Sequence, residues 1–547
     1  MWWRKHPSKI AGLLILVFCI GWGLGVGDVA LFDWDEVNFA ECSREMRVTG
    51  EYIYAQIGFL PFWEKPPLFF WVQSVFMELA GENAWGARLP NILITGATLG
   101  ILFVLGRTWH SPLFGLTWLF FHGISLLPSF YARSGLIDPL FNLFMLGSMI
   151  MGVEYLLRGT LLWGMGLGLF AGMATLTKGP VGLLLPALAV LSVGVLHRQF
   201  RRLLLLVLWA GLSYVFLVGG WVGLLAMRGT TTLLADFWAY QWRLLTTADA
   251  GHAGPWFYHL LVLLLGVFPA SFWAVGALRL PWKQLDMRAQ ALLFLSAWTV
   301  LIFSLVKTKI LHYSSLAYFG LSYLASWVWW HRRSWIIRWG WALGGIFTLL
   351  LGIVTFAAGP IMVEWSRWIE KIQDPFTREA IRTAPILWSG AEGWPGLFLI
   401  AGVGVVFLLP VRAHARLFLF GGILFVWQAL TLRNFAGRAE AYSQRSLREF
   451  CSEKAATGAV VWPLGFKSYI PFFYGRLAPD RSPWVTGSFD SFQAFLLSGE
   501  APFPVYFVSR IDRYEPFMKA HGLLLLEKRG GYVLLGLPPS GLKQANR

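Results

Sequence analysis

The chain has 547 residues, of which 56% are hydrophobic and only 14% are charged. Since a soluble domain carries about 25% charged residues, this composition excludes a soluble globular protein and predicts a polytopic membrane protein. The formal net charge of +16 fits basic cytoplasmic loops, and the absence of a basic run within a readout fold argues against nucleic-acid binding.

Apolar segments long enough to cross a membrane follow one another along most of the chain. At about 20 residues a span, we count about thirteen of them, at approximately 10–27, 88–106, 112–130, 139–157, 161–177, 180–196, 203–221, 257–278, 289–306, 313–330, 339–358, 394–410 and 417–432. Because lipid offers no hydrogen-bond partners to the backbone, such spans must be helical. The sequence therefore predicts an all-α transmembrane domain over residues 1–432.

The distribution of basic residues predicts the orientation of these spans. With the N-terminus in the cytoplasm, the short loops 197–202, 279–288, 331–338 and 411–416 all fall inside, and they are the most basic short loops of the chain. This agreement follows the positive-inside trend of inner (plasma) membrane proteins. Three longer connections, 28–87, 222–256 and 359–393, then face outside.

The C-terminal segment 433–547 differs in kind from the spans. It holds strand-like runs such as GAVVWPL and PVYFVS and turn signals such as PSG and RGG. These patterns predict a small α/β domain on the extracytoplasmic (periplasmic) side.

The first outer connection concentrates charged side chains beside the membrane. Asp35 and Glu36 follow Asp33, and an ionised carboxylate serves as a hydrogen-bond acceptor, a metal ligand or a general base. The alternative is a solvated acidic loop. Further along, two prolines hold Glu64 and Lys65 in an extended backbone. Lys65 suits a phosphate oxygen, or it is an interfacial lysine that snorkels.

Later outer segments carry further candidates. Asp138 lies where a span leaves the outer surface, either as a helix N-cap or as a functional acid. In the second long outer connection, Arg243 stands among aromatic residues, and His252 is either a zinc ligand together with Glu64 or an ordinary polar loop residue.

The segment VKTKILHYSS places two lysines, Lys307 and Lys309, outside and close to Tyr313. Two outer lysines depart from the positive-inside trend, which predicts an anionic ligand such as a phosphate at the membrane surface. The alternative is ordinary snorkelling at a helix end.

Taken together, these motifs resemble the polyprenyl-phosphate-sugar glycosyltransferases of GT-C architecture, which include the lipid A aminoarabinose transferases and the protein O-mannosyltransferases. Six elements occur in order within residues 28–320: DE…AE.SREM..G, EKP, a DP pair, TKG, an H..P.WY-like run and K.K…Y. The chain departs from the family pattern at two places: Asn38 stands where relatives often have an arginine, and the late motif reads KILHY instead of KLP.Y. The last spans and the tail match only in layout.

The resemblance implies a sugar donor linked through phosphate to a long isoprenoid such as undecaprenol, with inversion at the anomeric carbon. It implies that Asp35 is the main catalytic carboxylate and that Asp138 is a second acidic position. Zinc is implied at Glu64 and His252. The residues matching the donor phosphate positions are Lys65, Arg243, Lys307 and Tyr313.

The acceptor stays open among a lipid A-like lipid, an envelope glycan and a protein. The alternative function is a transporter or flippase of lipid-linked sugars, which would place polar groups near the bilayer midplane. Here the charge gathers in the outer loops, which favours chemistry at the membrane surface.

Overall fold

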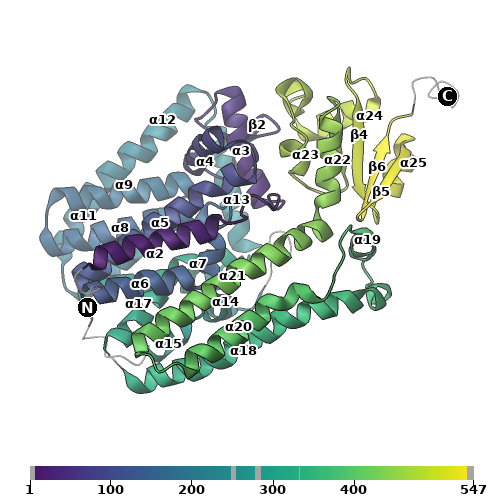
Figure 1. Cartoon of the computed structure of the whole chain (residues 1–547). Helices are drawn as coiled ribbons and strands as arrows, with labels where there is room; N and C mark the ends of the chain where they lie inside the picture. Colours follow the sequence, from purple (N-terminus) through teal and green to yellow (C-terminus); the bar gives the residue numbers. More distant parts are fainter. Residues whose placement is uncertain (1–5, 248–253, 278–284, 332, 539–547) are drawn as a thin grey trace.

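The computed structural model describes residues 6–247, 254–277, 285–331 and 333–538. A bundle of long helices forms its larger part, and a smaller α/β part lies at one end of the bundle (Figure 1). The bundle helices are α2 (Pro7–Gly23), α5 (Ala84–Trp109), α6 (Pro112–Ile124), α7 (Leu126–Ala132), α8 (Asp138–Arg158), α9 (Leu161–Lys178), α10 (Val181–Leu196), α11 (Phe200–Tyr214), α12 (Gly220–Met227), α14 (Tyr258–Gly266), α15 (Ala270–Ala277), α16 (Met287–Leu305), α17 (Tyr318–Trp330), α18 (Ser334–Val363), α20 (Trp394–Leu408) and α21 (Ala413–Ser443).

Each of the thirteen predicted segments coincides with one of these helices or with consecutive helices. By length and composition, however, seven described helices can cross a membrane, or up to nine if each of two bent pairs is one span. The pairs α6 with α7 and α14 with α15 bend by 73° and 120°, while α2 and α10 have only 17 and 16 residues. The predicted all-α membrane fold is confirmed. Hydropathy located all thirteen segments but does not register where a helix bends or falls short of full span length.

The three connections that we predicted to face outside are folded segments. The first contains α3 (Asp35–Thr49), the antiparallel hairpin of β1 (Ala55–Ile57) and β2 (Leu60–Phe62), and α4 (Leu68–Ala80). Gly50 ends α3 in the left-handed conformation, with φ 71°, which glycine adopts without steric cost. The second contains α13 (Thr232–Thr246), and the third contains α19 (Pro375–Thr383).

The C-terminal part has the α/β composition that the sequence predicts. Its sheet has the strand order β3-β4-β6-β5, in which β3 is parallel to β4 and the other pairs are antiparallel. Helix α21 runs past residue 432 to Ser443 and leads directly into it. The elements are α22 (Arg445–Ala455), β3 (Val460–Leu464), α23 (Ile470–Phe473), α24 (Phe489–Ser498), β4 (Val505–Arg510), α25 (Tyr514–His521), β5 (Leu524–Arg529) and β6 (Tyr532–Gly536).

Two hydrophobic cores hold the molecule together. One fills the bundle, and the other joins α3 and α4 to the C-terminal sheet. In the second core, Phe39 packs against Phe69 and Phe70, and the same core includes Phe450 and Trp462. Burying large aromatic side chains is a major source of stability, so α3 is held rigidly between the bundle and the C-terminal part.

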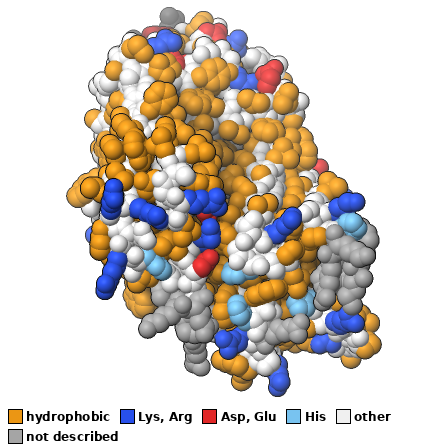
Figure 2. Space-filling view, turned by 90° about the vertical axis from the view of Figure 1, so that its left-hand side faces the viewer, with side chains coloured by type: hydrophobic (Ala, Val, Ile, Leu, Met, Phe, Trp, Pro, Cys, Tyr) orange, Lys and Arg blue, Asp and Glu red, His pale blue; other side chains and the backbone are white. Residues whose placement is uncertain are grey.

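Basic side chains gather at the end of the bundle away from the C-terminal part. Arg107 donates to Ser8, Arg202 donates to the carbonyl oxygens of Leu156 and Leu157, and Arg288 pairs with Glu154. These contacts bring the ends of separate helices together. Figure 2 shows this face, with Lys and Arg outnumbering Asp and Glu over its lower half.

Candidate active site

A cavity of about 840 Å³ lies at the opposite end of the bundle, beside the C-terminal part. Segments far apart in the sequence meet around it: the start of α3, the loop before α4, helix α13, the stretch after α16 and helix α21. Its charged and titratable lining residues include Asp33, Asp35, Glu36, Glu64, Lys65, Arg88, Arg133, Arg243, His312, Arg433 and Lys467. The cavity therefore combines carboxylates with several cations.

Asp35 is the first residue of α3, and its side chain is exposed at the cavity. The preceding Trp34 has φ 72°, a conformation that costs a bulky residue free energy and that often marks functional sites. Asp33 accepts the backbone N–H groups of Trp34 and Tyr469, and burial raises its pKa above the ordinary value. Asp33 thus joins this loop to the C-terminal part, while Asp35 remains accessible.

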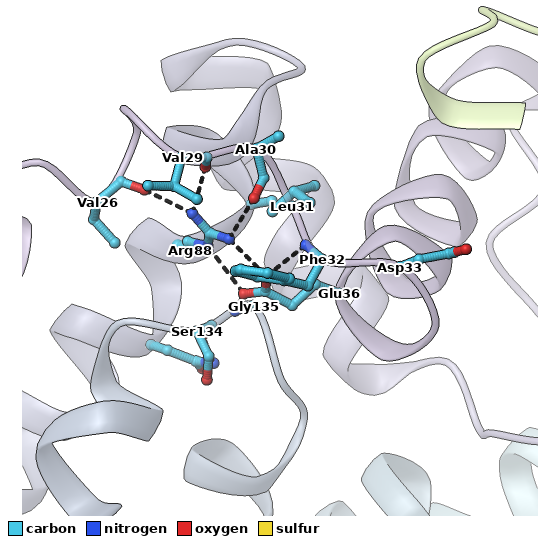
Figure 3. Close-up of polar contacts among 12 residues, drawn as sticks. Val26, Val29, Ala30, Leu31, Phe32, Asp33, Glu36, Arg88, Ser134 and Gly135 are labelled. Atoms are coloured by element: carbon cyan, nitrogen blue, oxygen red, sulfur yellow. Dashed lines mark hydrogen bonds and ion pairs between the residues drawn. The ribbon is translucent and has the colours of Figure 1, made fainter. Parts of the chain in front are cut away.

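Glu36 has a structural position, which does not suit the catalytic role that we predicted for it. Arg88 donates to both of its carboxylate oxygens, at 2.9 and 2.6 Å, and the N–H groups of Phe32 and Gly135 donate to it as well (Figure 3). Burial raises the pKa of Glu36, but the Arg88 charge and these bonds outweigh burial and hold the pKa below 4.5. A carboxylate with all these partners has little capacity left to accept a proton from a substrate.

Lys65 follows the β1–β2 hairpin in the chain and is half-buried beside α13. Its Nζ lies 5.3 Å from the ring centroid of Tyr240, and that ring also packs against Trp63. Burial lowers the pKa of Lys65, opposed by the charges of Glu64 and Asp35. The predicted phosphate-binding lysine therefore lies in the same cavity as the predicted catalytic carboxylate.

Asp138 begins α8 and is buried. Lys178, at the end of α9, donates to its Oδ1 across 2.6 Å, and His312 Nε2 lies 3.9 Å from its Oδ2. The Lys178 ammonium also lies 5.3 Å from the ring centroid of Tyr313. The TKG motif therefore supplies the partner of the second acid, a pairing that sequence spacing did not indicate.

Of the remaining phosphate candidates, Arg243 lies at the cavity, whereas Lys307 and Lys309 are not among its lining residues. Arg243 lines the cavity and lies 5.1 Å from the Tyr240 ring centroid. Lys307 is exposed and is not among the lining residues. Lys309 donates to the carbonyl oxygens of Phe303, Ser304 and Val306 at 3.0, 2.6 and 2.6 Å. Lys309 thus satisfies carbonyl groups at the end of α16, which does not fit the phosphate-binding role we predicted.

The metal prediction rests on two residues, of which His252 lies outside the described residues. Glu64 lines the cavity, with Lys467 Nζ 3.9 Å from its Oε1. Among the residues that the structure describes, no group of three or more His, Cys, Asp or Glu side chains is arranged to hold a metal ion. The zinc prediction therefore stays a prediction, and we derive no step through a metal.

Several residues that sequence reasoning missed shape this site. Arg88 orders the loop before α3, and the backbone N–H of Tyr469 binds Asp33. Lys467 lies over the Trp34 ring at 5.7 Å. Lys467 and Tyr469 are more than 400 positions away from Asp33 and Trp34 in the chain. No local sequence motif predicts such a contact.

Comparison with solved structures identifies the architecture. ArnT from Cupriavidus metallidurans bound to undecaprenyl phosphate superposes with a TM-score of 0.77 at 21% identity, over 97% of this chain and 99% of that chain. The chain has the GT-C fold. The apo state of the same protein gives a TM-score of 0.75 at 20% identity. The GT-C fold that the resemblance implied is thereby confirmed.

Sequence comparisons agree with this GT-C assignment. A family profile described as dolichyl-phosphate-mannose-protein mannosyltransferase matches residues 64–222. Undecaprenyl phosphate-alpha-4-amino-4-deoxy-L-arabinose arabinosyl transferase 2 from Proteus mirabilis is 28% identical over 317 residues, 56% of this chain and 57% of the relative. The corresponding enzyme from Pectobacterium carotovorum is 29% identical over 337 residues, 59% and 60% of the two chains. The match thus spans less than two thirds of these relatives.

Proposed function

We propose that this chain is a membrane glycosyltransferase that moves a sugar from a polyprenyl-phosphate donor to an acceptor outside the plasma membrane. The observation that carries the proposal is that Asp35, Lys65 and Arg243 line one cavity at the end of an apolar helical bundle. A transferase of this kind needs a base beside cations where a lipid-borne phosphate reaches the membrane surface.

The names of the similar proteins support this donor. The GT-C structure with the same fold holds undecaprenyl phosphate, and the similar sequences are named as undecaprenyl-phosphate-dependent arabinosyl transferases. By analogy, we propose undecaprenyl phosphate or a similar long isoprenoid phosphate as the carrier of the sugar. The acceptor is a lipid A-like lipid, an envelope glycan or a protein.

In the proposed reaction, Asp35 takes the proton of the acceptor nucleophile. The acceptor oxygen bonds to the anomeric carbon from the face opposite the phosphate, so the configuration inverts. The electron pair of the breaking bond stays on the phosphate oxygen, where negative charge develops. Lys65 and Arg243 stabilise that charge, because cations aimed at developing charge in a low-dielectric site are effective.

The distribution of charge supports an orientation with the N-terminus in the cytoplasm. The basic end of the bundle would face inward, and the cavity and the C-terminal part would face the periplasm or the exterior. A multi-pass protein of the inner membrane in this orientation takes its donor from the outer leaflet.

Mass spectrometry of envelope lipids and glycans tests the proposal. Cells without the gene should lack a sugar-sized mass on one glycoconjugate, and cells carrying only Asp35→Asn should lack the same mass. If the deletion changed a mass and Asp35→Asn did not, the chain would instead move a lipid-linked sugar across the membrane.

A further inference from the structure

His312 follows Leu311, which stands where the late motif of the family has a proline, and it lines the cavity. The ring belongs to the 3-10 helix η4 (Leu311–Ala317), between α16 and α17. It lines the cavity together with Asp35, Lys65 and Arg243. Its side chain is only 11% exposed.

Asp138 is positioned to orient this ring. Its Oδ1 accepts from Lys178, while its buried Oδ2 has no hydrogen-bond partner among the described residues. His312 Nε2 is 3.9 Å from that oxygen, and a shift of about 1 Å would close a hydrogen bond. A carboxylate facing Nε2 favours the tautomer protonated there, which leaves Nδ1 for a ligand.

The His312 ring lies among both carboxylates and cations, which act on its pKa in opposite directions. Burial lowers the pKa of His312 below its ordinary value, which favours the neutral imidazole. Carboxylates favour the imidazolium, and the neighbouring cations oppose it. The titratable groups that face the ring are Asp138 of α8, Lys178 of α9, Asp35 of α3, Lys65 before α4, Tyr131 of α7, His259 of α14 and the adjacent Tyr313.

We propose that His312 is a phosphate-binding residue of the donor site, which takes up a proton when the lipid phosphate enters and is oriented by Asp138. The inference rests on the proposed function. The sugar donor is a phosphodiester with one negative charge, and the lipid phosphate monoester that remains after transfer carries about −1.5 to −2 charges near neutral pH. Negative charge beside an imidazole favours its protonated form. The proton comes from water, and the imidazolium then donates a charge-assisted hydrogen bond to a phosphate oxygen.

This proton matters at the moment of transfer. When the bond between the anomeric carbon and the phosphate oxygen breaks, its electron pair stays on the phosphate, and the acceptor proton passes to Asp35. The phosphate therefore gains one negative charge beside His312. A positive charge there is worth more in the transition state than in the bound donor.

Binding of undecaprenyl phosphate to the purified full chain, followed by tryptophan fluorescence, tests this inference. At pH 6, His312→Gln should bind roughly tenfold more weakly than the wild type. The ratio should approach one by about pH 8.5, where the imidazole is neutral. His331→Gln removes an exposed histidine at the basic end and should follow the wild type throughout.

A ratio that stays constant with pH, or the absence of any difference, overturns the role of His312 while leaving the proposed function standing. No binding by the wild type overturns both. If His312→Gln fails to fold, the inference is tested on the wild type. Calorimetry of undecaprenyl phosphate binding in two buffers of different ionisation enthalpy measures the number of protons taken up or released. At about pH 7.5 the free phosphate is mostly dianionic, so binding should take up protons. Proton release or no proton exchange contradicts the inference.

Discussion

Arg88 and Glu36 form a buried ion pair across 2.6 Å that joins α5 to the first turn of α3. The same guanidinium donates to the carbonyl oxygens of Val26, Val29 and Ala30. One side chain thereby orders the loop that leads into α3. Asp35 precedes Glu36 directly, so the pair determines where the proposed base lies in the cavity.

Breaking this pair should destabilise the protein. Removing one partner of a buried ion pair leaves an uncompensated charge, which costs about 3–5 kcal/mol. Arg88→Gln should therefore clearly lower the midpoint of thermal unfolding, measured in detergent. The matched control is Arg367→Gln, which breaks the exposed 2.6 Å pair with Glu364 and should change the midpoint little. Equal unfolding midpoints for the two variants would show that the buried pair contributes no more to stability than the exposed pair.

The stabilising effect of Glu36 should depend on pH. Its pKa in the folded protein lies below the ordinary value of 4.5, so its contribution is fully present above that value and is lost as the pH falls through the folded pKa. The difference in unfolding midpoint between wild type and Glu36→Gln should therefore be largest near pH 6 and shrink below pH 4.5. A difference that grows on acidification contradicts the assigned pair.

Lys65 and Lys307 should behave differently although both lie in motifs that predict phosphate binding. Lys65 lines the cavity, whereas Lys307 is exposed outside its lining. Lys65→Ala should weaken binding of undecaprenyl phosphate by about tenfold, as expected for a lost charge-assisted contact. Lys307→Ala should bind like the wild type. The reverse order would place the phosphate elsewhere.

Lys309 should matter for stability and not for donor affinity. Its ammonium donates to three carbonyl oxygens at the end of α16. Lys309→Met keeps much of the side-chain volume and leaves those carbonyl groups without this donor, so the unfolding midpoint should fall. Titration of the folded variant with undecaprenyl phosphate should match the wild type. A selective loss of affinity at an unchanged midpoint would restore the predicted phosphate role.

Sequence patterns predicted the helical membrane fold because a long apolar run has few alternatives in lipid. They located Asp35, Lys65 and Arg243, which the structure brings to one cavity. They did not indicate the partners of Glu36 and Lys309. Arg88 is 52 positions away from Glu36 in the chain, and Lys309 turns back to carbonyl oxygens three to six positions before it. A charged residue in a motif shows its chemistry, but its partners appear only in the fold.

Helix α4 was missed as an element for a related reason. Its 13 residues pack against α3 and α5 outside the predicted spans, and a window of span length does not register so short a helix. Likewise, the Asp138 partner is Lys178, 40 positions further along. Arg133, five positions upstream of Asp138, donates to the Gly21 carbonyl oxygen.

The most direct test of the central claim compares wild type and Asp35→Asn, purified and supplied with a polyprenyl-phosphate sugar donor and the acceptor found by mass spectrometry. The account predicts that Asp35→Asn loses transfer by at least about a hundredfold, as expected for a lost general base, while its affinity for undecaprenyl phosphate stays within about twofold of the wild type. Normal transfer by Asp35→Asn would contradict the account.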